Sequence, residues 1–383
     1  MAASIQLPGR EGLLVIPSPG WASGYPPPTA RRVWAAAHVA AFDDERIDWK
    51  ATLRFREHLW AHGFGVAEAM DTAQRGMGLS WELARELIAR SASVARGALA
   101  RGALACGALA CGAGTDQLAD GESYPIPRIV DAYLSQMAFV QSAGADVILM
   151  ASRALAASAR GPGDYLSVYG ALLEAAERPV ILHWLGEAFD PALRGYWGGT
   201  DFDTAADTVL SLVDRYGEKV DGVKLSVLDA DREVALRRRL PSGIRLYTGD
   251  DFGYLDLIRG DSSGHSDALL GAFAAITAPA AAALAALDRG DLAGYDAAMA
   301  PTVALSRAIF EPPTFFYKVG VAFLAWLNGF QPRFAMLDGL ERRRPARHLI
   351  RVFELAAAAR ALADPDLAVE RMNELLARLM GSV

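Results

Sequence analysis

The chain has few cysteines and no segment typical of export or membrane insertion. Cys106 and Cys111 are the only cysteines among 383 residues, which excludes a disulfide framework and predicts a reducing, cytoplasmic environment. The N-terminus lacks a basic stretch followed by an apolar one, so we expect no signal peptide. The longest apolar stretch, residues 271–287, is mostly alanine and contains Pro279, and it is too weakly hydrophobic to span a bilayer.

Positive charge is in the minority, and lysine is scarce. The chain has 38 basic and 45 acidic residues, a net charge of −7 and an isoelectric point near 5.5. This balance argues against nucleic acid or an anionic membrane as a partner. Only four of the basic residues are lysines: Lys50, Lys219, Lys224 and Lys318. The hydrophobic content of 52% excludes intrinsic disorder and is sufficient for a large core.

Short apolar runs alternate with amphipathic helical segments between residues 31 and 290. The runs cover residues 33–39, 65–70, 104–112, 146–151, 180–184, 222–227, 244–248 and 269–275. Helical periodicity falls on residues 49–61, 81–95, 126–143, 164–176, 203–216 and 254–258. Continuously apolar strands are typical of a parallel sheet covered on both faces. Eight strand–helix units predict an α/β fold, a (β/α)8 TIM barrel, with an open doubly wound sheet as the competing architecture.

The segments that flank this region have a different character. Residues 1–30 form a proline- and glycine-rich lead-in without helical periodicity. Residues 291–383 are almost wholly helical in pattern, which predicts a C-terminal helical subdomain or an oligomer interface. The pentapeptide RGALA occurs twice from residue 96, followed by CGALA, and a period of five fits neither helix nor strand. We expect a helix end or loop there, with the copy next to Gly112 forming the third strand.

Lys224 is the most unusual of the lysines, because it lies in an apolar run, DGVKLSV at residues 221–227. An ammonium group buried without a partner is costly, so the group either forms an ion pair or lowers its pKa. A lysine with a lowered pKa is the nucleophile that forms a Schiff base with a carbonyl compound. The alternative is a structural lysine paired with a carboxylate such as Glu68 or Asp250. Lys318, on a helical stretch after the barrel, is the weaker candidate.

Other candidate residues lie at the carboxyl ends of the predicted strands, where barrel enzymes carry their catalytic groups. His38 and His183 are either acid–base groups or metal ligands, or they are simply hydrogen-bonded in the core. His38, Glu68, His183 and Asp250 together form an alternative divalent metal site, although no short spacing supports it. Asp250 and Asp251 either bind substrate hydroxyls or cap the next helix.

Two further histidines lie outside this set of strand ends. His58 and His62 are four residues apart on a helix that we expect to lie at the surface.

Several strand-end motifs together resemble a known family. GAGTD at 112–116 resembles its third-strand loop, PVILHW at 179–184 its fifth strand, GVKL at 222–225 its Schiff-base lysine motif and TGDD at 248–251 its strand-seven motif. On these motifs the chain resembles the dihydrodipicolinate synthase and N-acetylneuraminate lyase family of lysine-dependent aldolases. It is most similar to a divergent, uncharacterised dihydrodipicolinate synthase-like branch. The resemblance implies that Lys224 is the Schiff-base nucleophile and that Lys318 is structural.

The chain departs from the family pattern at three places. MDTAQ at 70–74 replaces the family motif Gly-Thr-Thr-Gly-Glu and leaves Thr72 at the carboxylate-binding and proton-relay position. The tyrosine proton shuttle after strand four is replaced by Ser152 and Arg153, and the usual Tyr-Asn after strand five becomes His183-Trp184. A Schiff-base enzyme still needs an acid–base group, for which His183 and Glu68 are the candidates.

These observations predict a cytoplasmic lyase that cleaves a carbon–carbon or carbon–oxygen bond of a polar keto acid or keto sugar through an imine, without a cofactor. The predicted catalytic residues are Lys224, Thr72, His183 and Glu68, and the predicted substrate-binding residues are Asp71, Arg153, Asp250, Asp251 and Trp184. A metal-dependent barrel isomerase or lyase and a noncatalytic sugar-binding barrel are the alternatives. The resemblance also implies a homo-oligomer, a dimer or tetramer.

Overall fold

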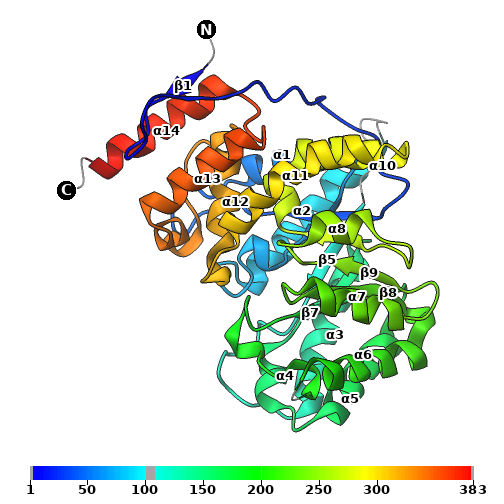
Figure 1. Ribbon diagram of the computed structural model, residues 1–383. Helices are drawn as coiled ribbons and strands as arrows, with labels where there is room; N and C mark the ends of the chain where they lie inside the picture. Colours follow the sequence, from blue (N-terminus) through cyan, green and yellow to red (C-terminus); the bar gives the residue numbers. More distant parts are fainter. Residues whose placement is uncertain (1–2, 101–107, 200, 381–383) are drawn as a thin grey trace.

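Eight parallel strands close into a barrel at the centre of the molecule (Figure 1). The computed structural model describes residues 3–100, 108–199 and 201–380. The barrel strands are β3 (Val33–Ala36), β4 (Gly65–Glu68), β5 (Leu109–Ala113), β6 (Asp146–Leu149), β7 (Val180–Leu185), β8 (Val220–Ser226), β9 (Arg245–Thr248) and β10 (Asp267–Leu270). Each strand pairs with the next in sequence, and β10 pairs with β3 to close the ring. The predicted (β/α)8 fold is confirmed, and the open sheet is wrong.

Helices follow the strands and cover the outside of the barrel. They are α1 (Trp49–Ala61), α2 (Trp81–Ala100), α3 (Ile126–Ser142), α4 (Arg153–Ser158), α5 (Pro162–Ala175), α6 (Phe202–Tyr216), α7 (Ala230–Arg239), α8 (Tyr254–Arg259), α9 (Ala272–Ala275) and α10 (Thr277–Asp288). Several begin at a residue whose side-chain oxygen accepts a backbone N–H of the first turn, as Asp48 does for α1 and Ser152 for α4. These caps fix where the chain turns from strand end to helix.

The structure corrects several predicted boundaries. The eighth run, predicted as a strand over residues 269–275, divides into β10 and the short helix α9, because apolar alanine-rich sequence suits a buried helix as well as a strand. Helices α4 and α7 were not predicted. The lead-in contains two short paired strands, β1 (Ser4–Ile5) and β2 (Leu14–Val15). The first RGALA copy ends α2, as expected, while residues 101–107 lie outside the described part.

The barrel interior is filled by side chains from alternate strand positions. One buried cluster, separate from the outer core, consists of Trp34, Ala36, Ala67, Met70, Ala110, Ile148, Met150, Ile181, Tyr247 and Leu269. Successive strand residues point to opposite faces, so these positions define which neighbours face inward. Gly65 makes room for the largest of them, because a Cβ atom there would lie 2.4 Å from the Trp34 ring. The interior is therefore a packed core.

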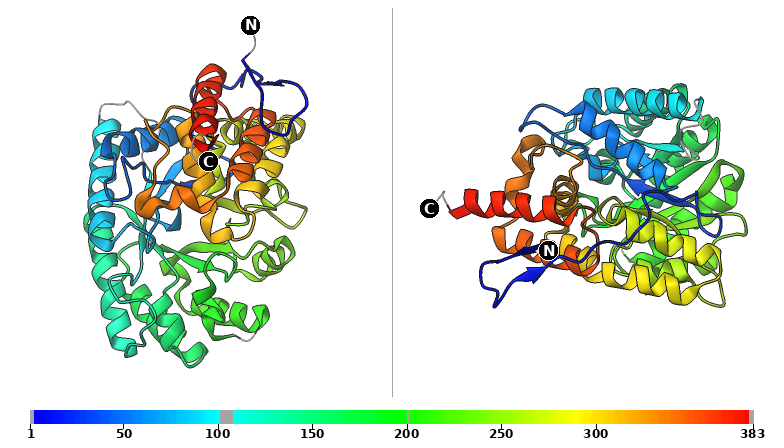
Figure 2. Two further views of the ribbon diagram at one scale, coloured as in Figure 1. Left: turned by 90° about the vertical axis from the view of Figure 1, so that its left-hand side faces the viewer. Right: turned by 90° about the horizontal axis from the view of Figure 1, so that it is seen from above.

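The C-terminal helices pack against one side of the barrel (Figures 1 and 2). They are α11 (Leu292–Ile309), α12 (Tyr317–Leu327), α13 (Ala346–Ala358) and α14 (Pro365–Met380). Helix α12 contacts α9, which follows the last barrel strand, and β1 of the lead-in lies against α14. The predicted division into a barrel and a subdomain at residue 290 stays a prediction. None of the helices in the described ranges combines the length and apolarity needed to cross a membrane.

Glu233 on α7 makes stability depend on pH. Its carboxylate accepts hydrogen bonds from Thr248 Oγ1 (3.0 Å) and Ser266 Oγ (2.7 Å) and is buried, and burial raises its pKa to about 8. Between the unfolded value of 4.5 and about 8, only the folded protein holds the proton. The free energy of unfolding therefore falls as pH rises, by up to about 1.4 kcal/mol per pH unit.

We expect Glu233→Gln to remove this contribution to the pH dependence, measured by urea unfolding at pH 5 and pH 8. The control variant Glu177→Gln, at an exposed position, keeps it. An equal pH dependence in the wild-type protein and both variants would contradict the assignment to Glu233.

Candidate functional site

Lys224 points into the barrel near its open end. It is paired in register with His183 on the neighbouring strand, and its Cε lies 3.1 Å from the position that a Cβ on Gly249 of the next strand end would occupy. The side chain is 7% exposed. Within the described residues it forms no hydrogen bond and no ion pair within 4 Å. Burial lowers the pKa of Lys224, and the charges of Asp71 and Asp251 offset that effect only in part.

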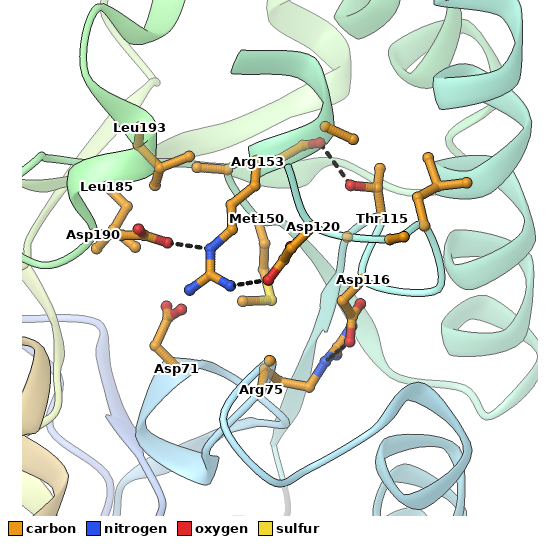
Figure 3. Close-up of a pocket in the computed structure, with 17 residues that line it drawn as sticks. Asp71, Arg75, Thr115, Asp116, Asp120, Met150, Arg153, Leu185, Asp190 and Leu193 are labelled. Atoms are coloured by element: carbon orange, nitrogen blue, oxygen red, sulfur yellow. Dashed lines mark hydrogen bonds and ion pairs between the residues drawn. The ribbon is translucent and has the colours of Figure 1, made fainter. Parts of the chain in front are cut away.

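A cavity of about 280 Å³ opens beside Asp71 at the mouth of the barrel (Figure 3). Asp71 begins a short 3₁₀ helix, η1 (Asp71–Ala73), after β4, and its carboxylate points into the cavity. In the described part of the chain this carboxylate has no hydrogen-bond partner. Asp71 lines the cavity and its charge acts on Lys224, which is not itself among the described residues that line this cavity.

Two arginines in the cavity wall are already matched by carboxylates. Arg153, at the start of α4, bonds Asp190 through Nε (2.6 Å) and Asp120 through Nη1 (2.5 Å). Burial acts against its charge, but the Asp190 hydrogen bond and the two negative charges outweigh it and raise the pKa of Arg153. Arg75 is fixed by Asp116 and by Gln136 Oε1 (2.8 Å). The cavity therefore offers carboxylate oxygens and no guanidinium without a counter-ion.

Tyr317 is a functional candidate that the sequence analysis missed. It begins α12, and its hydroxyl lies 2.7 Å from Thr72 Oγ1. Its ring stacks on Phe310 with centroids 4.4 Å apart, and a Cβ on Gly271 would lie 3.1 Å from Tyr317 Cε2. Burial and the charges of Asp71 and Asp251 raise the pKa of Tyr317. In the sequence, Tyr317 lies in the stretch PPTFFYK at 312–318, where only Lys318 was considered as a candidate.

Lys318, the next residue, lies at the edge of the same site. It is buried, donates to Phe315 O (3.0 Å) and lies over the rings of Phe315 and Tyr317. Burial lowers its pKa to about 8. It lines a small crevice together with Asp71 and Arg153, so its predicted structural role stays a prediction.

Three further predicted residues, His183, Asp250 and Asp251, lie near Lys224 or in the turn that follows β9. His183 Nε2 lies 3.4 Å from Ser226 Oγ, and burial together with the Lys224 charge lowers the pKa of His183 well below its ordinary value. Asp251 accepts a hydrogen bond from Ala272 N (3.1 Å), and burial raises its pKa although the charge of Lys224 opposes the shift. Asp250 accepts the N–H groups of residues 252 and 253, so it caps the turn, which was the alternative to hydroxyl binding.

Two predicted site residues lie outside the barrel mouth. Glu68 follows an inward position and therefore faces outward, where it pairs with Arg56 through two 2.8 Å contacts and accepts a 2.7 Å hydrogen bond from Ser91. These contacts give the carboxylate a structural role, and the predicted catalytic role stays a prediction. Trp184 also faces outward and stacks on Phe202 with centroids 4.9 Å apart, and its predicted contact with substrate stays a prediction.

The alternative metal site is not formed. No three His, Cys, Asp or Glu side chains in residues 3–100, 108–199 and 201–380 lie close enough together to hold a metal ion. Glu68 is occupied by Arg56, Asp250 by its turn, and His38 Nε2 by Gln331 Oε1 at 3.0 Å. Burial also lowers the pKa of His38 to about 3, so its ring is neutral.

The Arg56–Glu68 pair predicts a structural phenotype. Glu68→Gln leaves a buried guanidinium without its counter-charge, which costs about 3–5 kcal/mol of unfolding free energy. The double variant Arg56→Met/Glu68→Met recovers most of the loss, because it buries no charge. Both effects are measured by urea unfolding. A Glu68→Gln protein with an unchanged free energy of unfolding but no catalytic activity would support the predicted catalytic role of Glu68.

The fold is a (β/α)8 barrel with a lysine on the sixth barrel strand. Residues 11–381 match a family described as "Protein of unknown function (DUF993)", and the chain belongs to that family. None of the curated proteins matches the chain.

Solved dihydrodipicolinate synthases share this architecture. The enzyme from Oceanobacillus iheyensis is 16% identical at a TM-score of 0.63, covering 85% of this chain and 95% of that one. The 4-hydroxy-tetrahydrodipicolinate synthase from Methylacidiphilum fumariolicum SolV is 18% identical at 0.63, covering 88% and 99%. The Thermotoga maritima enzyme is 15% identical at 0.62, covering 87% and 100%. At these identities the likeness shows a common fold.

Proposed function

We propose that the protein is a lyase that forms a Schiff base between Lys224 and the carbonyl carbon of a hydroxylated ketone. The observation that carries the proposal is the placement of Lys224: its amine is buried inside the barrel mouth without a fixed partner in the described part of the chain, and Asp71, whose charge acts on it, lines an open cavity. A lysine whose pKa is lowered by burial keeps a larger fraction of the neutral amine that attacks a carbonyl. The dihydrodipicolinate synthase fold of the solved neighbours supports the same class of chemistry.

The first step joins the substrate to the enzyme. The neutral amine of Lys224 adds to the carbonyl carbon, the carbonyl oxygen takes up protons and leaves as water, and an iminium remains. The iminium draws in the electron pair of the bond between the α- and β-carbons while the β-hydroxyl loses its proton, so this bond breaks, the β-fragment leaves as a carbonyl compound and an enamine remains. Protonation of the enamine and hydrolysis of the resulting iminium by water release the second product and free Lys224. Proton transfers in this sequence require a group beside the reacting atoms. The Tyr317–Thr72 hydroxyl pair and Asp71 supply these groups, and neutral His183 lies beside the amine.

The cavity wall favours a hydroxyl-rich substrate over one with an uncompensated carboxylate. Both wall arginines are paired with carboxylates, and Asp71 remains free to accept hydrogen bonds. Carboxylate oxygens accept hydrogen bonds from hydroxyls and repel a second anion. We therefore place keto sugars ahead of simple keto acids.

Covalent trapping tests the nucleophile. Sodium borohydride added with dihydroxyacetone or fructose reduces the iminium, and the peptide that contains Lys224 gains the ketone's mass less one oxygen atom, because the carbonyl oxygen leaves as water. Lys224→Gln abolishes the adduct, and Lys318→Gln retains it, because Lys318 donates to Phe315 O away from the carbonyl. Peptide mass spectrometry locates the label, and pyruvate as the ketone labels less than the hydroxylated compounds.

Other outcomes of trapping decide against this mechanism. Labelling of Lys318 in place of Lys224 would move the nucleophile to α12. Saturable sugar binding without any adduct would favour the noncatalytic sugar-binding barrel.

The role of Tyr317 is tested by proton exchange. A ketone held as an iminium exchanges the hydrogens on its neighbouring carbon with deuterium oxide, and nuclear magnetic resonance follows the rate. Tyr317→Phe slows this exchange by about 10²–10⁴-fold, the usual contribution of a positioned acid–base group. Borohydride labelling of Lys224 persists in the variant. Tyr295→Phe, which removes another buried hydroxyl, leaves the rate unchanged, and an unchanged rate in Tyr317→Phe would remove the tyrosine from the mechanism.

A further inference from the structure

A second cavity, of about 370 Å³, lies between α1, the start of α10 and the lead-in. It shares no lining residue with the cavity at the barrel mouth and is the larger of the two. The end of α12 and the segment after α13 complete its wall through Asn328, Phe330 and Arg360. Trp21 of the lead-in is held in place by a 2.8 Å hydrogen bond from its Nε1 to Arg360 O. The cavity is thus built from five separate parts of the chain.

His58 and His62 supply unused hydrogen-bonding atoms in this wall. His62 is 3% exposed, and its Nδ1 lies 2.9 Å from His58 O, so Nδ1 carries the proton and Nε2 is an acceptor. This Nε2, like both ring nitrogens of His58, has no partner in the described part of the chain. Burial lowers the pKa of both histidines, that of His58 to about 3, so both rings are neutral. Helix α1 has an exposed side, as the sequence predicts, but His62 is buried and His58 half-buried, on the side of the helix that faces the cavity.

Most of the rest of the wall is aromatic and apolar, and its other polar side chains are those of Ser23, Thr277, Asn328 and the exposed Arg360. Trp21, Phe55 and Phe330 line it together with several alanines, and the His58 and Phe330 rings lie 4.4 Å apart. Asn328 is already engaged, because its amide donates to Ala361 O and accepts from Ala363 N. No aspartate or glutamate is among the described lining residues, in contrast to the acidic cavity at the barrel mouth. Aromatic walls and the unpartnered Nε2 of the buried His62 suit an uncharged ring with one donor.

We propose that this cavity is a second ligand site, which takes a small uncharged aromatic molecule bearing a ring N–H or O–H. The ring lies among Trp21, Phe55 and Phe330, and its donor binds Nε2 of His62. The burial of an aromatic face contributes the affinity, and the histidine selects for the donor.

Two elements connect this site with the lysine site. Ala274 and Ala275 of α9 line the second cavity, and Ala272 of the same helix donates to Asp251, whose charge acts on Lys224. Helix α12 carries Tyr317 at its start and Ala325 in the second cavity wall near its end. A ligand that fixes α9 and α12 therefore also fixes the groups around Lys224. The site is a place for an effector, and its existence does not depend on the proposed lyase activity.

Calorimetry with indole, toluene and benzoate as probes tests the site. Indole binds the wild-type protein saturably with one site per chain, while toluene, which lacks a donor, and benzoate, which is charged, bind about tenfold more weakly. His62→Phe keeps a ring but removes the acceptor, so it weakens indole about five- to tenfold and leaves toluene unchanged. Absence of saturable indole binding, or equal affinity for indole and toluene, overturns the proposal.

A cavity-filling variant locates the binding. Ala278→Phe, on the α10 turn that lines the cavity, abolishes indole binding, and Ala285→Phe on the same helix outside the cavity leaves it intact. Circular dichroism checks that both variants fold, and Phe330→Ala provides a second, weakening change. Indole binding that survives Ala278→Phe refutes the location. Bound indole also slows hydrogen exchange of the amides at residues 271–276, and unchanged exchange there refutes the link to the lysine site.

Discussion

The structure around the candidate site depends on how charge is held inside a barrel that is otherwise dry. A buried ammonium is costly unless compensated, and Lys224 is compensated at a distance by Asp71 and Asp251. Neither carboxylate forms a close ion pair with it, so the amine keeps its freedom to react. A direct contact would have stabilised the fold and quenched the nucleophile. The glycines beside these residues, Gly249 and Gly271, leave the space that the arrangement requires.

The other buried charges show the opposite solution. Arg56 and Glu68 are joined through two hydrogen bonds, and Arg75 and Asp116 through a similar fork, which fixes the chain after β4 against its neighbours. Such pairs hold geometry and have no capacity left for a ligand. In this protein, buried charged residues in close ion pairs are the structural ones. Those without a close ion pair in the described residues, Lys224 and Asp71, are the functional candidates.

The sequence was sufficient to predict the barrel and the burial of Lys224. Both leave local signals, which are apolar runs at regular spacing and a charged residue inside one of these runs. The directions in which Glu68 and Trp184 face, and the position of Tyr317, could not be predicted, for physical reasons. Whether Glu68 faces the lumen or the helices depends on strand phase, which a fully apolar strand does not reveal. The direction of Trp184 could not be predicted for the same reason. Tyr317 approaches Thr72 from a distance of 245 residues along the chain, a contact that no local pattern encodes.

Helix α12 lies outside the barrel strands, yet it carries Tyr317, a residue of the candidate site. The sixth barrel strand supplies Lys224 and the segments after two other strands supply Asp71 and Asp251, while the phenol that meets Thr72 comes from a helix beyond the barrel. Under the proposed mechanism the site is complete only where this helix packs beside the barrel, so substitutions in α12 can alter the site while every barrel strand keeps its sequence.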